Sequence, residues 1–263
     1  MNTSNENFAV LIDADNISHT KIKAILDEIA NMGVAVIKRV YGDFAQPNLA
    51  PWKDVALQFS ITSVQQYAYT KNKNATDTAL IIDAMDILHN KPFISGFCIL
   101  SSDSDYTRLA IRLKESGKRV YGFGEKKTPN PFIRSCDKFI YVENLDSAAA
   151  TPAINPKDST HVNDDMKTSS STQIASQQYP PVDNELKNLI ISTINSSSNE
   201  DGWALLSKVG YIVTKKKTDF DPRNYGFQKL MPLIKSMGDL FEILEKTATN
   251  NLKIIYVRNK TKK

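Results

Sequence analysis

Short apolar runs alternate with segments of helical spacing through the first 143 residues, and this alternation limits the fold more than any other feature. Between the runs, apolar residues recur at helical spacing, and Gly or Pro stands at the junctions. The runs have the length and side chains of buried strands, and they are 8–12, 34–40, 63–69, 97–100, 120–123 and 139–142. Strands that are apolar on both faces are typical of a parallel sheet covered by helices. The pattern therefore predicts a doubly wound α/β sheet.

Charge and composition divide the chain into three parts. Residues 1–146 carry 17 basic and 17 acidic side chains, whereas residues 183–263 carry 14 basic and 9 acidic side chains. Residues 147–182 contain ten Ser or Thr and four Pro, with so little apolar surface that burial cannot offset their ordering entropy. We therefore expect a first domain at 1–146, a flexible linker at 147–182 and a second domain at 183–263. The basic excess of the second domain favours a polyanionic partner.

Several classes of protein are excluded by composition. No segment has the roughly 18 to 20 uninterrupted apolar residues of a membrane-spanning helix, and the N-terminal MNTSNENF lacks the basic and apolar parts of a leader. We expect no membrane association and a cytoplasmic location. Cys98 and Cys136 are too few for a disulfide framework. The isolated His19, His89 and His161 offer no arrangement for nucleophilic catalysis.

Acidic side chains follow the first and fourth predicted strands. Asp13 and Asp15 come directly after the first strand, and Asp103 and Asp105 come after the fourth. Open parallel sheets bind ligands beyond the carboxyl ends of the strands, where the strand order reverses. In the common order 3-2-1-4-5 the first and fourth strands are neighbours, so we expect both pairs to face one crevice.

A further carboxylate is placed by helical geometry. The segment 76–89 has a continuous apolar stripe, and at about 100° per residue Asp77 falls in the middle of that stripe, in the first turn. Its side chain is therefore expected to point along the upper edge of the sheet into the crevice. Asp86 falls opposite the stripe and should be solvated, whereas Asp83 lies at its boundary.

The acidic residues have a structural alternative, because Asp and Asn before a helix are ordinary N-caps. For Asp15, Asn16, Ser104 and Asp105, each taken singly, that alternative stays open. Asp13, Asp77 and Asp103 come together from distant positions and share no capping role. Two carboxylates about 4 Å apart repel by about 4 kcal/mol at an effective dielectric of about 20, so such a cluster needs a cation. Oxygen ligands without His or Cys indicate a hard ion, Mg²⁺ or Mn²⁺.

Four motifs along the first domain, LIDADN, KNATDTALIIDAMD, ILSSDSDY and VYGFGEKKTPNPFIRSCDKFIYV, resemble the NYN branch of the PIN-like metal-dependent ribonucleases over about residues 7–143. The resemblance implies a compact Rossmann-like nuclease domain. It also implies that Asp13, Asp77, Asp103 and Asp105 occupy the acidic catalytic and metal-binding positions of the family. Supporting positions are Asp15, Asn16, Ser102 and Asp83, and Asp15 stands where many relatives carry Gly. Whether one or two ions bind stays open.

The second domain contains three segments of helical spacing followed by two β-like runs. In order, they are 185–194, 204–209, 225–234, 240–244 and 252–257. Three helices and a two-stranded wing predict a winged helix-turn-helix. The segments GWALLSKVG and FDPRNYGFQKLMPLIKS resemble the OST-HTH or LOTUS domain, which is associated with RNA binding and, in some members, with protein partners. We expect Trp203, Phe227 and Leu230 in the core of this domain.

Basic side chains in both domains are candidate contacts for an RNA backbone. Thr128-Pro129 is typical of the N-cap and first residue of a helix that reaches Arg134, and a helix N-terminus with lysines beside it binds phosphate. The candidates are Lys71, Lys73, Lys126, Lys127, Thr128 and Arg134 in the first domain, and Lys215, Lys216, Lys217, Arg223, Tyr225 and Lys229 in the second. Tyr225 offers a ring for stacking on a base. The alternative for each charged run is a solvated face.

The function predicted from these features is a divalent-metal-dependent endoribonuclease with a C-terminal RNA-binding module. One alternative is a non-catalytic RNA-binding adaptor with a vestigial pocket. A second is a haloacid-dehalogenase-type phosphatase, because Asp13-Ala14-Asp15 after the first strand mimics its nucleophile and acid pair. Ile17 stands where that family needs Thr or Val, and the later acidic pair is spaced too narrowly, so this alternative is disfavoured.

Overall fold

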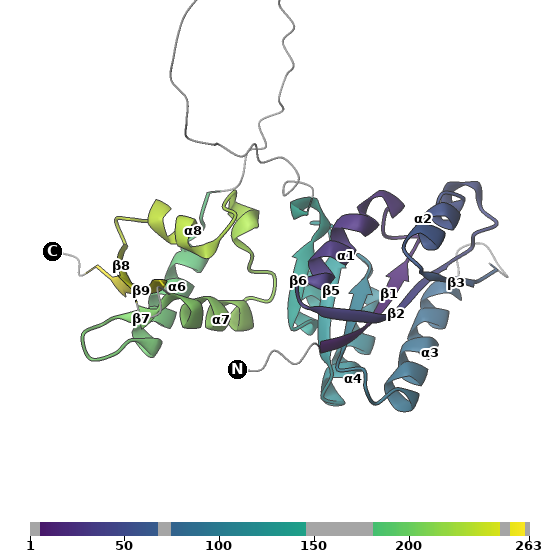
Figure 1. The fold of residues 1–263 in the computed structure, drawn as a ribbon, viewed down its shortest axis with the longest axis horizontal. Helices are drawn as coiled ribbons and strands as arrows, with labels where there is room; N and C mark the ends of the chain where they lie inside the picture. Colours follow the sequence, from purple (N-terminus) through teal and green to yellow (C-terminus); the bar gives the residue numbers. More distant parts are fainter. Residues whose placement is uncertain (1–5, 68–74, 146–180, 248–252, 261–263) are drawn as a thin grey trace, which may run out of the picture.

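The computed structural model describes residues 6–67, 75–145, 181–247 and 253–260. The first domain is built on a six-stranded parallel sheet in the order β3-β2-β1-β4-β5-β6 (Figure 1). The strands are β1 (Glu6–Asp13), β2 (Gly33–Gly42), β3 (Thr62–Gln65), β4 (Gly96–Leu100), β5 (Arg119–Gly124) and β6 (Lys138–Tyr141). The doubly wound α/β sheet is confirmed, and the strand order reverses between β1 and β4 as expected.

Helices cover both faces of this sheet (Figure 1). The α-helices are α1 (Ile22–Ala30), α2 (Trp52–Gln58), α3 (Ala75–Asn90), α4 (Thr107–Glu115) and α5 (Asn130–Ser135), and the short 3-10 turns are η1 (His19–Lys21), η2 (Pro47–Leu49), η3 (Ser104–Tyr106) and η4 (Val142–Asn144). Successive side chains of a strand point to opposite faces. Val10 and Ile12 accordingly pack with α1 and α2, whereas Ala9 and Leu11 pack with α3, α4 and α5. The sheet is therefore buried on both faces.

The C-terminal domain has a separate hydrophobic core, formed by residues between 182 and 257. Its elements are α6 (Asn184–Ser197), β7 (Ala204–Leu205), α7 (Leu206–Lys216), η6 (Pro222–Tyr225), α8 (Leu230–Ser236), β8 (Phe241–Thr247) and β9 (Lys253–Asn259). Strands β8 and β9 form the expected hairpin, and β7 adds an antiparallel third strand in the order β7-β9-β8. Asp183 caps α6 by accepting a hydrogen bond from the Leu186 amide at 2.6 Å.

Two helices of this domain begin later than the sequence predicts. Ala204 and Leu205 pair with β9 as a strand before α7 starts. Within the segment predicted as one helix at 225–234, Gly226 has a φ of 82°, in the left-handed region that ends a helical turn. The preceding turn η6 therefore stops there, and α8 begins only at Leu230.

The C-terminal domain contacts the first domain along β6. The Phe139 amide donates to the Thr218 carbonyl at 2.8 Å, and the Thr218 hydroxyl donates to the Ile133 carbonyl at 3.0 Å. Tyr141 donates through its hydroxyl to the Asp219 carboxylate at 3.0 Å. The Thr218 carbonyl thus gives the β6 backbone a hydrogen-bond acceptor in the C-terminal domain. The predicted linker at 147–182 lies, apart from its last two residues, outside the described residues.

An ion pair completes this interface. The Arg223 guanidinium donates to Glu28 on α1 at 3.0 and 3.2 Å, and to the neighbouring Asp221 at 2.6 Å. The side chains of Arg223 and Glu28 are only 15% and 18% exposed. Because water is largely kept away from the pair, its attraction is screened less than that of a surface pair.

We expect Arg223→Ala to loosen the contact between the domains while leaving each core folded. The substitution leaves the partly buried Glu28 and Asp221 carboxylates without their cation, at a cost of roughly 1 to 3 kcal/mol. Faster hydrogen exchange of the Phe139 amide and a larger radius of gyration in X-ray scattering would report the loosening. The matched control is Lys216→Ala, which removes a charge from an exposed position of the same domain. Equal exchange rates in wild type and Arg223→Ala would contradict the expectation.

None of the helices in the described part of the chain is long and apolar enough to cross a membrane.

Candidate metal centre

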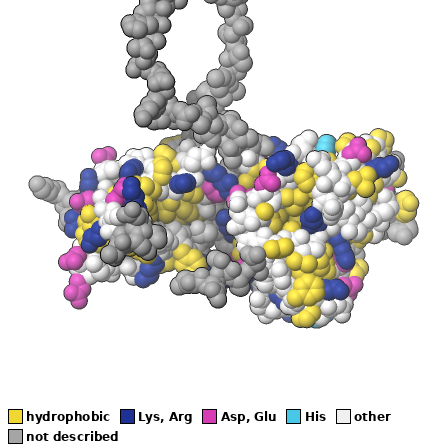
Figure 2. All heavy atoms as spheres, viewed as in Figure 1, with side chains coloured by type: hydrophobic (Ala, Val, Ile, Leu, Met, Phe, Trp, Pro, Cys, Tyr) yellow, Lys and Arg dark blue, Asp and Glu magenta, His cyan; other side chains and the backbone are white. Residues whose placement is uncertain are grey.

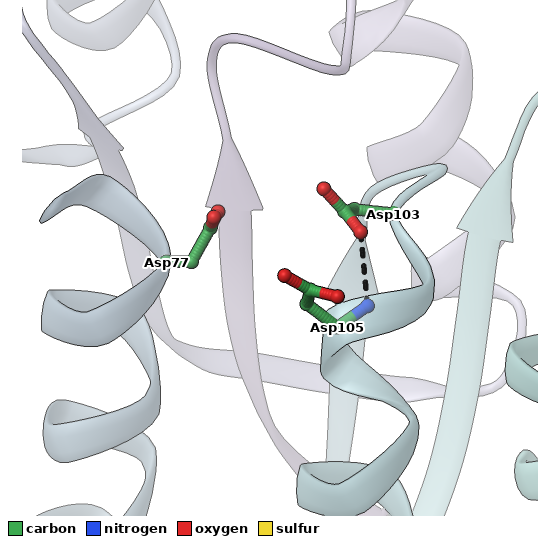
Figure 3. Close-up of side chains that lie close together, drawn as sticks. All are labelled: Asp77, Asp103 and Asp105. Atoms are coloured by element: carbon green, nitrogen blue, oxygen red, sulfur yellow. Dashed lines mark hydrogen bonds between the residues drawn. The ribbon is translucent and has the colours of Figure 1, made fainter. Parts of the chain in front are cut away.

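Three carboxylates come together beyond the carboxyl ends of β1 and β4. Asp77 lies in the first turn of α3, while Asp103 and Asp105 follow β4. One oxygen of each lies within 4.8 Å of the others, and Figure 3 shows Asp77 pointing across from α3 toward the other two. The sequence prediction that Asp77 faces this crevice therefore agrees with the structure. Asp86, on the opposite side of the same helix, is exposed as expected.

Asp103 has a capping role as well as a place in this cluster. Its Oδ1 accepts a hydrogen bond from the Asp105 amide at 2.9 Å, which caps the turn η3. Its own amide donates to the Ser101 hydroxyl oxygen at 3.0 Å. The capping role predicted as an alternative therefore applies to Oδ1 of Asp103. The hydrogen bonds hold the Asp103-Asp105 segment in a defined conformation.

Asp13 is a fully buried carboxylate behind the three others. Its Oδ2 accepts from the Asn16 side-chain amide at 2.7 Å and from the Ser101 hydroxyl at 2.8 Å, and its Oδ1 accepts from the Asp15 amide at 3.1 Å. Burial nevertheless raises the pKa of Asp13 to about 6, and the negative charge of Asp77 contributes in the same direction. Asp13 is thus held by hydrogen bonds and is within electrostatic reach of the cluster.

Tyr106 joins Asp13 to Asp77. Its buried hydroxyl donates to Asp77 Oδ1 at 2.7 Å and lies 3.4 Å from Asp13 Oδ2. Burial raises the pKa of Asp77, and the charges of Asp103 and Asp105 raise it further, against the lowering effect of the Tyr106 hydrogen bond. The like charges make the unliganded cluster electrostatically unfavourable, and a bound cation would relieve that repulsion.

The raised pKa of Asp13 makes a prediction about stability without metal. Its ordinary value is 3.8 and its folded value is about 6, so between these values the folded protein binds a proton that the unfolded chain has lost. Stability should therefore fall as pH rises through this window, by up to about 3 kcal/mol from this group. Denaturant unfolding in EDTA at pH 4.5 and pH 7 measures the fall. Asp13→Asn is the control, and parallel pH profiles for the two proteins would show that Asp13 does not contribute.

The supporting residues predicted from the sequence have different surroundings in the structure. Asp15 and Asn16 both hydrogen-bond to Asp13. Ser102 accepts from the Glu125 amide at 2.9 Å and so connects the segments that follow β4 and β5. Asp83 is bound instead by Arg39 and Tyr41 of β2. The structure thus brings Asp15 and Asn16 to the carboxylates and gives Asp83 other partners.

Sequence reasoning did not identify two residues of this site, Ser101 and Tyr106. Ser101 connects Asp13 to the Asp103 backbone, and Tyr106 connects Asp13 to Asp77. One signal for Tyr106 was available, because a buried tyrosine hydroxyl usually needs a polar partner and this one stands next to an acidic motif. Nothing in the local pattern distinguished Ser101 from its neighbour Ser102.

The predicted phosphate contacts of the first domain are partly engaged within the protein. Lys127 forms an ion pair with Glu125 at 2.9 Å, and the Lys126 amide donates to Glu143 at 2.9 Å. The predicted N-cap role of Thr128 is wrong, because its hydroxyl donates to the Glu125 carbonyl and Pro129 occupies the cap position of α5. The side chain of Arg134 is exposed. Lys71 and Lys73 lie outside the described residues.

Basic residues of the second domain also differ in their surroundings. Lys215 lies over the Tyr211 ring at 4.6 Å, and Lys217 pairs with Asp219 at 3.4 Å. Lys216 and Lys229 are exposed. Arg223 is in the ion pair between the domains, and Tyr225 packs against the hydrophobic core of the C-terminal domain. In the view of Figure 2, Lys and Arg side chains are spread over both domains without forming one continuous patch.

Comparison with protein families agrees with both resemblances. The NYN domain matches residues 7–145, and the OST-HTH/LOTUS domain matches residues 178–252. No curated protein matches the chain.

Two solved structures are similar to parts of it. A protein of unknown function from Vibrio parahaemolyticus RIMD 2210633 is 16% identical, with 54% of this chain and 95% of that chain covered and a TM-score of 0.45. An uncharacterized protein from Nitrosomonas europaea is 32% identical, with 38% of this chain and 94% of that chain covered and a TM-score of 0.30. Because the NYN match spans more than half of the chain, this protein belongs to the NYN family, and it joins that PIN-like nuclease domain to an OST-HTH/LOTUS domain of the RNA-binding kind.

Proposed function

We propose that this protein is a divalent-metal-dependent endoribonuclease whose C-terminal domain holds RNA. The observation that carries the proposal is the convergence of Asp77, Asp103 and Asp105 within 4.8 Å, inside the segment that matches the NYN domain. Their place beyond the ends of β1 and β4 is where open parallel sheets bind ligands.

The donor atoms fit a hard divalent cation. All three groups offer carboxylate oxygen, and Mg²⁺ and Mn²⁺ prefer oxygen ligands. We propose Asp77, Asp103 and Asp105 as the ligands. Asp13, which the sequence analysis also placed among the metal-binding residues, is proposed as the fourth carboxylate of the site. A cation bound there supplies Lewis-acid chemistry, which polarises a phosphate and brings the pKa of a bound water toward neutrality.

The chain itself supplies a preorganised set of carboxylates for this chemistry. Tyr106 holds Asp77 by a hydrogen bond, and Ser101 joins Asp13 to the Asp103 backbone. These carboxylates are therefore already ordered before substrate arrives. Asp105 is exposed, which leaves this side of the cluster open to an RNA strand. Hydrolysis adds the oxygen of a water molecule to the phosphorus and releases one ester oxygen, which leaves with a proton.

A cleavage assay on labelled single-stranded and hairpin RNA tests the proposal. Wild type should cut RNA with Mn²⁺ or Mg²⁺ and stop cutting in EDTA, and Asp103→Asn should lose activity. RNA binding without cutting in any metal would support the non-catalytic adaptor instead. Metal-dependent hydrolysis of p-nitrophenyl phosphate without RNA cleavage would support the phosphatase.

A further inference from the structure

The β8-β9 hairpin has one face in the core and one face outside it. The two strands pair Ile243 with Val257 and Leu244 with Tyr256. Val257 lies in the hydrophobic core of the C-terminal domain and Ile243 packs against it, so the alternation of strand side chains places Leu244 and Tyr256 on the other face. Arg258, two residues after Tyr256, is on that outer face as well. The β7-β9-β8 sheet lies on the side of the C-terminal domain that is remote from the NYN sheet (Figure 1).

Two aromatic rings on this outer surface carry cations above them. The Arg258 guanidinium carbon lies 4.6 Å from the centroid of the Trp203 ring, and the Lys246 Nζ lies 5.6 Å from that of Tyr256. Trp203 was expected in the core, but it is only partly buried and is not part of the core cluster. We call Trp203, Lys246, Tyr256 and Arg258 the wing platform.

The loop that carries Trp203 is held in place by its own hydrogen bonds. The Trp203 amide donates to the Asn199 side-chain oxygen at 2.8 Å, and the Asn199 amide donates back to the Trp203 carbonyl at 2.9 Å. Gly202 has a φ of 80°, which a residue with a side chain rarely adopts. Arg258 is oriented by Glu242, whose carboxylate accepts from it at 2.6 Å. The platform is therefore built before any ligand arrives.

A polar hollow of about 430 Å³ lies between these side chains. Asn199 and Asp201 line it together with the platform residues and Leu244. The Asp201 carboxylate disfavours a phosphate at its corner of the hollow but accepts hydrogen bonds from the amino group of a base. Aromatic faces beside Lys and Arg are the combination that binds single-stranded nucleic acid, because bases stack on the rings while cations hold the backbone.

We propose that the wing platform binds bases of single-stranded RNA by stacking on Trp203 and Tyr256, with the adjacent phosphates held by Lys246. This inference rests on the proposed RNA-binding function and locates it at a surface distinct from the lysines of α7. RNA held there must extend around the domain to reach the carboxylates. The platform should accordingly affect RNA affinity without changing the cleavage rate at saturation.

Tryptophan fluorescence tests the stacking directly. The chain has two tryptophans, and Trp52 is buried in the first domain at 1% exposure, so a change on adding oligo-uridine reports Trp203. With the full chain in EDTA, we expect oligo-uridine to quench the tryptophan emission of the wild type. In Trp203→Phe the remaining emission comes from Trp52, and we expect no quenching. Unchanged wild-type emission while fluorescence anisotropy shows RNA binding would overturn the platform but leave the proposed function standing.

Affinity measurements with substituted rings complete the test. Tyr256→Leu and Trp203→Leu should each weaken binding by roughly tenfold, whereas Tyr256→Phe should bind nearly as wild type does. Phe93→Leu, at an exposed aromatic residue of the first domain, is the matched control. Lys246→Ala should reduce the slope of log affinity against log salt by about one, and Tyr256→Leu should leave the slope unchanged.

The affinity and stability measurements distinguish a failure of the wing platform from a failure of the proposed RNA-binding function. Equal affinity of wild type and both leucine variants, each with a wild-type melting temperature, would overturn the platform alone. If a leucine variant melts early, the tryptophan emission of the unsubstituted protein on adding oligo-uridine decides instead. Absence of RNA binding by the wild-type chain would overturn both the platform and the proposed RNA-binding function.

Discussion

Asp77→Asn is expected to lower RNA cleavage by at least two orders of magnitude while leaving the fold intact. The substitution removes the charge that α3 contributes to the cluster of Asp77, Asp103 and Asp105. Loss of a catalytic carboxylate costs at least several kcal/mol of activation free energy, since each 1.4 kcal/mol is about tenfold in rate. The new amide oxygen still accepts from Tyr106, whose hydroxyl donates to this side chain at 2.7 Å, so the packing around it should persist.

Asp86→Asn provides the matched control for this experiment. It makes the same chemical change on the same helix, at an exposed position on the side away from the cluster. Its cleavage rate on saturating RNA and its melting temperature should both be close to wild type. Activity of Asp77→Asn above about a tenth of wild type would assign Asp77 a structural role.

Residues 1–146 without the C-terminal domain are expected to cut a saturating short RNA at a rate similar to that of the full chain, but with RNA affinity lowered by roughly tenfold or more. The two cores of the first domain contain only residues between 8 and 145, and the third core contains only residues between 182 and 257. Among the described residues, the hydrogen bonds that hold Asp13, Asp77 and Asp103 all join residues of the first domain. Each domain should therefore fold alone, and the second should act by raising the local concentration of RNA.

Salt dependence separates the two ways in which the second domain can act. Binding of RNA by residues 183–263 should weaken steeply with salt, because Lys and Arg displace counterions from phosphates. An inactive 1–146 fragment with a wild-type far-ultraviolet spectrum would show that the second domain completes the active site. RNA binding by 183–263 that is absent, or that does not respond to salt, would favour a protein partner for this domain.

The α/β architecture and most of the acidic cluster were predictable because they depend on local periodicity. Runs that are apolar throughout predict strands buried on both faces, and β1 and β4 are such runs. Parallel strands end at the same edge, so the acidic residues that follow neighbouring strands had to come close together. Asp77 could be added because the apolar stripe of α3 fixes the direction of each side chain around the helix axis.

The partners of individual polar groups depended on the tertiary structure. Asp83 lay at the boundary of the α3 stripe, and only the position of β2 decided that Arg39 and Tyr41 would bind it. Arg223 had the sequence context of an RNA contact, yet its described partners are Glu28 of the other domain and its neighbour Asp221. Such pairings join residues far apart in the chain, and periodicity carries no information about them.

The surroundings of two aromatic residues, Tyr106 and Trp203, were also decided by packing and not by the local sequence. The sequence by itself determined the alternation of strands and helices and the acidic residues that follow the strands, since these depend on local patterns. The strand order, which brings the two acidic segments to neighbouring strands, was decided by the tertiary structure. Whether Tyr106 would join two carboxylates, or Trp203 would lie outside the core beneath Arg258, was decided only in the folded protein. The physical reason is that an amphipathic ring is stable both in a core and under a polar group, so its surroundings choose between them.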